Sequence, residues 1–348
     1  MRHTHLINYY IGVLVCILAL LACGHQPAEN DHSAVMLFEK GRYPFVTLHE
    51  GKYYFSMQTE GADTVALWCA DQLEQLAEGQ QRVIWTAQGD GMEHFWSPEL
   101  HRLNNRWYLY FEADDGNTDD HQLFVMECQG DNPMTDPFVM KGPIVTNLEW
   151  NYGIHPNVIQ LPSGEMYLFW SGWPKRRAET ETQCIYLARL SDPWTICSER
   201  VMISKPEYEW ERQWINPNGN RSAYPIYVNE NPEAFLSPDG LRLFVAYSAS
   251  GIWTLYQSLG LLSVPLSADL LDANAWTKSS EPLFMPQQQN GLCTANICVL
   301  PLPDDTTSQV VYEARWNRNA QGIETRQVFM QPMSWTPDGT PQFGVPNI

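Results

Sequence analysis

The chain has 348 residues, with 40 acidic and 21 basic side chains and a formal net charge of −19 at pH 7. An acidic surface of this kind repels phosphate backbones, which excludes nucleic acid as an expected partner. Aromatic residues make up 12% of the chain, including 14 Trp and 16 Tyr, and they predict a β-rich core with some rings available to stack on sugar faces.

The first residues have the pattern of an export signal. An apolar run from Ile11 to Leu21 is too short for a spanning helix and ends in small residues around Cys23. This ending resembles a bacterial lipoprotein signal, in which the thiol of Cys23 is lipidated and becomes the new N-terminus. We expect residues 1–22 to be a signal peptide and 23–35 a tether. The protein would then be exported to the periplasm or outer-membrane surface and contact the membrane only through its lipid anchor. A simple secretory signal cut elsewhere is the alternative.

A hairpin pattern recurs along the rest of the chain. Each copy has a proline, an alternating apolar strand, a turn of Gly, Asn or Asp, and a strand dense in aromatic residues. The four copies are YPFVTLHEGKYYFSMQT from Tyr43, SPELHRLNNRWYLYFEAD from Ser97, HPNVIQLPSGEMYLFWSG from His155 and NPEAFLSPDGLRLFVAYSASG from Asn231. A fifth, degenerate unit without the proline follows from Gly291.

Repeats of about 50 to 75 residues, with three or four strands each, predict a β-propeller. Five units predict five blades in one all-β domain covering residues 36–348. We expect a strand near Met36 to Phe38 to close against the last blade. Since the innermost strands of a propeller surround its axis, the residues that begin them should converge on one pocket.

Cysteine and histidine spacing excludes several kinds of site. Six cysteines lie beyond Cys23 and could pair in an exported protein, but most are interpreted as small buried hydrophobic residues. No Cys/His spacing typical of a metal site is present, and we expect neither a metal nor another cofactor. All nine histidines lie at or before His155, which excludes a histidine-dependent triad assembled late in the chain.

Several segments resemble glycoside hydrolase family 43, especially members similar to α-L-arabinofuranosidases. The segment WSPELHRLNNRWYLYFEA is similar to the family's WAPE segment and the strand that follows it. Other counterparts occur in the expected order: YLFWSGWP, LSDPWTI, PEYEW, YSASG, ADLLDANAWTK and QPMSWTPDGTPQFGVP. The resemblance covers residues from about 40 to the end and implies a five-bladed propeller.

The resemblance implies an inverting hydrolysis carried out by carboxylates, but two of them are replaced here. Tyr43 stands at the position of the aspartate that acts as base, and His155 at that of a second aspartate that tunes the acid. Glu230 matches the general acid, so the base is unassigned. Glu313 occupies a position where the family has histidine and is a candidate relocated base; an activated Tyr43 is another.

Other residues are expected to bind substrate. They are Trp96, Glu99, Trp170, Asn229, Trp253 and Arg326, although a place in the blade core is open for the tryptophans. The leading hypothesis is an exported glycoside hydrolase-like protein that acts on polysaccharide or oligosaccharide fragments, as an arabinofuranosidase-like or altered exo-glycosidase. The alternative is a non-catalytic carbohydrate-binding lipoprotein on a glycosidase scaffold. In both, the partner is a carbohydrate.

Overall fold

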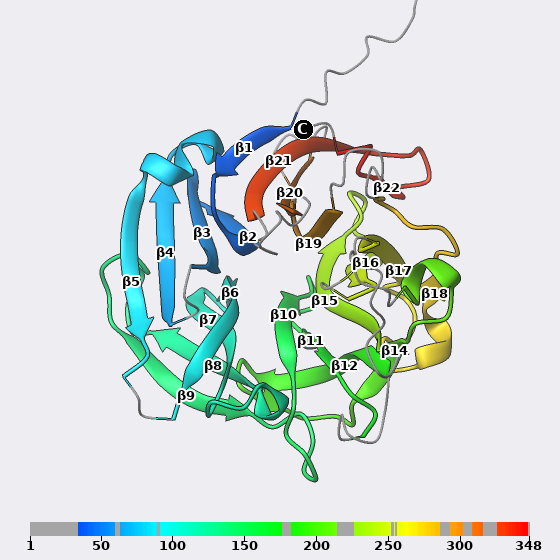
Figure 1. Cartoon of the computed structure of the whole chain (residues 1–348), viewed down its shortest axis with the longest axis horizontal. Helices are drawn as coiled ribbons and strands as arrows, with labels where there is room; N and C mark the ends of the chain where they lie inside the picture. The colour runs from blue at the N-terminus through cyan, green and yellow to red at the C-terminus, as the bar shows by residue number, and fades with distance from the viewer. Residues whose placement is uncertain are drawn as a thin grey trace, which may run out of the picture. The chain divides into compact units, whose positions relative to one another are not determined.

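A computed structural model describes residues 34–59, 63–88, 91–175, 182–213, 226–251, 254, 256–285, 293–301, 308–315 and 326–346. They belong to one unit from Ala34 to Ile348, and five β-sheet blades surround a common axis in it (Figure 1). Cys23, the expected signal peptide and most of the tether lie outside these residues. In the described part of the chain, the few helices are short 3₁₀ turns, and none has the length and apolarity needed to cross a bilayer.

Most blades are built from four antiparallel strands. The first blade contains β2 (Arg42–His49), β3 (Lys52–Gln58), β4 (Thr64–Ala70) and β5 (Gln80–Thr86). The second contains β6 (Glu93–Leu103), β7 (Arg106–Asp114), β8 (Gln122–Cys128) and β9 (Phe138–Ile144). The third contains β10 (Ile154–Gln160), β11 (Met166–Gly172) and β12 (Thr182–Asp192), with β13 (Thr195–Ile196) and β14 (Val201–Ser204) pairing with β12.

The last two blades complete the ring. The fourth contains β15 (Tyr227–Leu236), β16 (Arg242–Ala249), β17 (Ser258–Pro265) and β18 (Thr277–Lys278). The fifth contains β19 (Cys293–Leu300), β20 (Ser308–Arg315) and β21 (Arg326–Trp335), with β22 (Pro341–Gln342) and β1 (Val35–Phe38) pairing with β21. The antiparallel pairing of β1 with β21 confirms that the N-terminal strand closes against the last blade.

Two features of the sheets follow from local chemistry. The β2–β3 hairpin turns through Glu50 and Gly51, both at positive φ, which gives the twist that suits a two-residue turn. Asn104 and Asn105 do the same between β6 and β7. The third and fourth blades are also joined by a short parallel pairing of β12 with β15, which the repeat did not predict.

Five apolar clusters hold the blades together, one at each interface between neighbouring blades. Trp107 and Trp170 are fully buried in two of them. Replacing a buried aromatic side chain of this size by alanine costs about 3–5 kcal/mol, so these clusters fix the positions of the inner strands. Cys69, Cys128, Cys184 and Cys298 are free and buried, whereas Cys197 is free and exposed.

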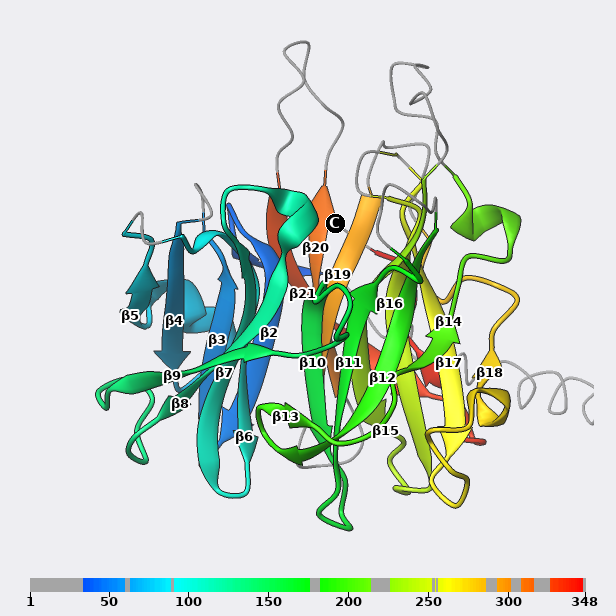
Figure 2. The same ribbon diagram turned by 90° about the horizontal axis from the view of Figure 1, so that it is seen from below.

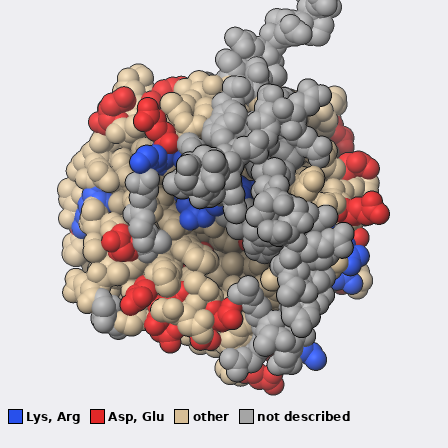
Figure 3. Space-filling model, in the orientation of Figure 1, with Lys and Arg blue, Asp and Glu red and all other residues tan. Residues whose placement is uncertain are grey.

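Figure 2 shows the blades on edge, with the inner strands β10, β15 and β19 running along the axis. Acidic side chains lie at several separate places around the face seen in Figure 3. This distribution agrees with a negative charge that is spread along the chain.

Candidate functional site: an axial pocket

Each inner strand is interrupted by a β-bulge. One non-glycine residue in each bulge has positive φ: Tyr43 (50°), Ser97 (41°), His155 (55°), Asn231 (53°) and Asn296 (48°). The strand register shifts at all five positions. Such backbone is costly for these residue types and clusters at functional sites, where the surrounding fold maintains it. The bulges therefore mark the rim of a candidate site.

A cavity of about 200 Å³ lies at this end of the axis. Tyr43, His155 and Glu230 all line it, so the structure brings together three residues singled out in the sequence. The other lining residues are Arg42, Trp96, Thr118, Tyr152, Ile154, Trp173, Gln183 and Ile226. Most of these were missed: Arg42 adjoins Tyr43 in the sequence, but Gln183 and Ile226 carry no motif that could have indicated them.

Tyr43 is held as a neutral phenol. Its backbone amide donates to Glu313 Oε2 at 3.3 Å, and its ring lies 5.2 Å from that of His155. Burial raises the pKa of Tyr43 well above its ordinary value of 10. A phenol with such a pKa is a poor base and a poor nucleophile near neutral pH.

His155 is buried and uncharged. Its Nδ1 lies 3.3 Å from Ser171 Oγ, and the backbone amide of Asn231 donates to the same oxygen at 2.9 Å. Burial lowers the pKa of His155 to about 3. The imidazole is therefore a hydrogen-bonding group and not a cation at physiological pH.

Glu230, the residue predicted to be the general acid, is buried beside the cavity. The residue is 8% exposed, and its carboxyl accepts a hydrogen bond from Gln257 Nε2 at 3.3 Å. Burial raises the pKa of Glu230 to about 7, although the Arg315 guanidinium opposes the shift. Among the described residues that line the cavity, Glu230 supplies the one carboxyl group.

Glu313, the candidate relocated base, lies behind the cavity wall. Arg326 Nη1 donates to its Oε1 at 2.6 Å, while Asn296 Nδ2 donates to its Oε2 at 2.8 Å. Burial alone would raise the pKa of Glu313, but the guanidinium groups of Arg326 and Arg42 outweigh it and lower the pKa. Both oxygens are thus engaged with donors, which leaves this carboxylate poorly placed to take a proton from water.

Three residues expected to bind substrate have structural surroundings instead. Trp170 is fully buried in the core between the second and third blades. Asn229 is also fully buried and donates to Ser204 Oγ and Glu211 Oε1, because adjacent strand residues face opposite ways and Glu230 takes the side facing the cavity. Arg326 is engaged with Glu313 and is not among the described lining residues.

Glu99 also lies away from the cavity, in a polar layer deeper along the axis. Asn157 Nδ2 donates to Glu99 Oε2 at 3.1 Å and to Glu233 Oε2 at 2.8 Å. Burial raises the pKa of both carboxyl groups, that of Glu233 to about 8. Trp96, in contrast, lines the cavity and stacks on His121 at 4.1 Å, whereas Trp253 lies outside the described residues.

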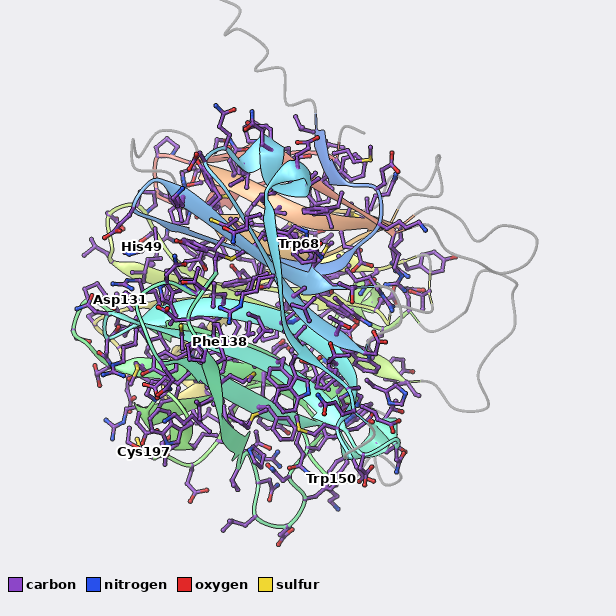
Figure 4. The ribbon with its side chains drawn as sticks, turned by 90° about the vertical axis from the view of Figure 1, so that its left-hand side faces the viewer. His49, Trp68, Asp131, Phe138, Trp150 and Cys197 are labelled. Atoms are coloured by element: carbon purple, nitrogen blue, oxygen red, sulfur yellow. The ribbon has the colours of Figure 1, made fainter. Side chains whose placement is uncertain are left out.

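A second cavity, of about 990 Å³, includes Asn157, Glu233 and His49 in its lining. Figure 4 views the disc from its side and shows His49 and Trp150 toward opposite faces. Trp150 stacks at 4.9 Å on Tyr152, which lines the smaller cavity. The two cavities therefore open toward opposite ends of the axis. The described residues contain no group of His, Cys, Asp and Glu side chains that could hold a metal ion.

Comparison with known proteins gives a consistent result. The family model for glycosyl hydrolases family 43 matches residues 36–341. The chain is 31% identical to an extracellular exo-α-(1→5)-L-arabinofuranosidase of Streptomyces avermitilis, over 98% of this chain and 70% of that protein. It is 30% identical to α-L-arabinofuranosidase B of Pyricularia oryzae, over 85% of this chain and 59% of that protein. The crystal structure of an α-L-arabinofuranosidase from Lactobacillus brevis superimposes with a TM-score of 0.78 at 28% identity, covering 91% of this chain and 96% of that one.

Proposed function

The chain belongs to glycosyl hydrolase family 43, and we propose that it binds the terminal sugar of an arabinose-containing glycan without the hydrolytic power of an intact glycosidase. The observation that carries this proposal is the lining of the axial cavity, where Glu230 is the one carboxyl group among the described residues. Inverting hydrolysis needs two carboxyl groups about 6.5–9.5 Å apart, one to protonate the leaving oxygen and one to activate water.

The two residues at the expected aspartate positions do not replace the missing base. The pKa of Tyr43 is raised, so the phenol keeps its proton, and the pKa of His155 is lowered to about 3, so its imidazole is a weak base. Efficient proton transfer needs a base with a pKa near the working pH. Glu230 can still donate a proton or a hydrogen bond, which is sufficient for binding a glycosidic oxygen.

The rest of the cavity suits a sugar ring. Aromatic side chains of Trp96, Tyr152 and Trp173 contribute to its wall, and a sugar presents apolar C–H faces to such rings. Polar groups of Arg42 and Gln183 lie in the same lining and can bond hydroxyl groups. A cavity of about 200 Å³ has room for one sugar unit and not for a long chain, which favours recognition of a chain end.

We further propose that the protein is exported and anchored through Cys23, with carbohydrate as its partner outside the cell. Two of its relatives, from Streptomyces avermitilis and Streptomyces chartreusis, are named extracellular arabinofuranosidases. The apolar run before Cys23 supports the same location for this chain.

Calorimetric titration with methyl α-L-arabinofuranoside, combined with hydrolysis assays on 4-nitrophenyl α-L-arabinofuranoside, tests the proposal. We expect measurable binding, and turnover about 10²–10⁴ lower than that of an arabinofuranosidase, because a positioned general base is missing. Glu230→Gln should weaken binding while the exposed Glu199→Gln leaves it unchanged. Turnover at ordinary rates, of about 1–10³ s⁻¹, that Glu230→Gln abolishes would overturn the proposal in favour of an enzyme.

A further inference from the structure

Several buried polar atoms beside the sugar cavity have no hydrogen-bond partner among the described residues. They are both carboxyl oxygens of Glu112, Nε2 of His155 and Oγ of Ser97. Glu112 is fully buried, and Ser97 and His155 are 2% and 3% exposed. Buried polar groups are nearly always paired in folded proteins, so such a cluster requires an explanation.

The fold itself brings these atoms together. Glu112 lies on β7 opposite Trp96 in the strand register, directly beside the bulge of β6 that contains Ser97. His155 lies on the bulge of the neighbouring inner strand, and its Nε2 is 3.9 Å from Glu112 Oε1. Since Trp96 and His155 both line the cavity, the Glu112 carboxyl lies immediately behind its wall.

The contacts of His155 are compatible with the tautomer in which Nδ1 accepts and Nε2 donates. The Ser171 hydroxyl accepts from the backbone amide of Asn231, so its own proton can be donated to His155 Nδ1. With Nδ1 as the acceptor, the proton of the neutral ring lies on Nε2. Nε2 is therefore a donor that faces Glu112 at a distance too long for a direct hydrogen bond.

The Glu112 carboxyl can both accept and donate. Burial raises the pKa of Glu112 to about 8, although the His155 backbone amide and the Ser97 hydroxyl lie close enough to oppose the shift. At neutral pH this group is mostly a protonated acid. One oxygen atom placed within about 2.8 Å of both His155 Nε2 and Glu112 Oε1 would satisfy the donor and the carboxyl together.

We propose that His155 and Glu112 form a specificity site that binds one hydroxyl group of the sugar. The hydroxyl oxygen accepts from His155 Nε2, and the hydroxyl donates to an oxygen of the Glu112 carboxyl. Because this carboxyl keeps its own proton at neutral pH and lies behind the cavity wall, it does not supply the second carboxylate that would activate water. This proposal rests on the proposed function, because the ligand is the sugar bound in the same cavity. It adds that one particular hydroxyl is recognised, and that Glu112, which was not among the candidate site residues, is required to recognise it.

Two substitutions of the same kind separate a binding role from a structural one. Glu112→Leu removes the carboxyl and keeps a similar volume, whereas Glu112→Gln keeps both an acceptor and a donor. Glu127→Leu is the matched control, since Glu127 lies in the same blade but pairs with Lys141 and Arg106. The ligands for calorimetry are methyl α-L-arabinofuranoside and its 2-deoxy, 3-deoxy and 5-deoxy analogues.

We expect one deoxy analogue to bind the unaltered protein about tenfold more weakly than the parent glycoside. That analogue lacks the hydroxyl that His155 and Glu112 bind, so their polar atoms stay unsatisfied. Glu112→Leu should weaken the parent by a similar factor and bind that analogue no worse than the unaltered protein does. Glu112→Gln and Glu127→Leu should retain the affinity for the parent. If Glu112→Leu and removal of the hydroxyl each lowered the binding affinity by independent, additive amounts, the proposal would be overturned. Two groups that contact each other must show non-additive effects on affinity.

Thermal stability gives a second readout that does not depend on the ligand. Glu112→Leu replaces an unsatisfied buried carboxyl by an apolar group and should raise Tm by about 2–4 °C, whereas Glu127→Leu breaks ion pairs and should not. Absence of binding by the unaltered protein would defeat the proposed function and the specificity site with it, whereas binding without any hydroxyl preference would defeat the specificity site alone. A fall in Tm for Glu112→Leu would show that Glu112 has a structural partner and would overturn the specificity site in either case.

Discussion

The ion pair between Glu313 and Arg326 should be a main support of the axial end of the fifth blade. Glu313→Gln removes the charge while keeping the shape of a fully buried side chain. The carboxylate accepts from Arg326 at 2.6 Å, from Asn296 at 2.8 Å and from the Tyr43 amide at 3.3 Å. The substitution therefore affects three donors that belong to three different strands.

The expected cost follows from these contacts. A hydrogen bond to a charged group contributes about 1.5–3 kcal/mol and a neutral one about 1 kcal/mol. Arg326 is only 14% exposed and would lose the negative charge of Glu313, and breaking a buried ion pair in this way costs about 3–5 kcal/mol. We expect Glu313→Gln to lower the free energy of unfolding by about 3–5 kcal/mol at pH 7.

The same contacts fix the pH dependence. The pKa of Glu313 is lowered on folding, so the stabilisation is present above the ordinary carboxyl pKa and is lost as the pH falls through the folded value. Urea denaturation of the unaltered protein and Glu313→Gln, at pH 7 and pH 4, measures this effect. A difference below about 1 kcal/mol at pH 7 would refute the reasoning, because it would place the pair among weak surface contacts.

Three further expectations concern the site, the buried acids and the anchor. The double variant Tyr43→Asp with His155→Asp should raise hydrolysis of an aryl arabinofuranoside by about 10²–10⁴, and unchanged turnover would argue against a missing base. Burial raises the pKa of Glu230 to about 7 and of Glu233 to about 8, so the folded state binds more protons than the unfolded state near neutral pH. Tm should therefore rise when the pH is lowered from 8.5 to 6.5, and a scanning calorimetry trace that is flat across this range would contradict the raised values. Cys23→Ala should release the protein from membranes into the soluble fraction, and continued sedimentation with membranes would count against lipidation.

The fold could be predicted because its signals are local and repeated. Each of the five repeat units corresponds to an observed blade, and the alternating strands and Gly or Asn turns lie within these blades. Met36 lies in the strand that closes the ring. The parallel pairing of β12 with β15 could not be predicted, since it depends on how two blades meet in space.

The site could be predicted only where a motif marked the axis. Tyr43, His155 and Glu230 line one cavity, as the convergence of inner strands implies. Trp170 lies in the blade core, the alternative left open for it, because an aromatic strand does not show which of its faces meets the neighbouring blade. Glu112 lies on β7, the second strand of its blade, and the sequence pattern there does not show whether a carboxyl group points toward the axis or toward the surface.

The five bulges have a consequence for laboratory evolution. Four residue types, Tyr, Ser, His and Asn, already occupy the same positive-φ position in different blades, so the scaffold tolerates varied side chains there. None of the five belongs to the apolar clusters between the blades. A codon library restricted to these positions therefore changes two residues that line the pocket and three in the other bulges, without altering the packing that keeps the ring closed.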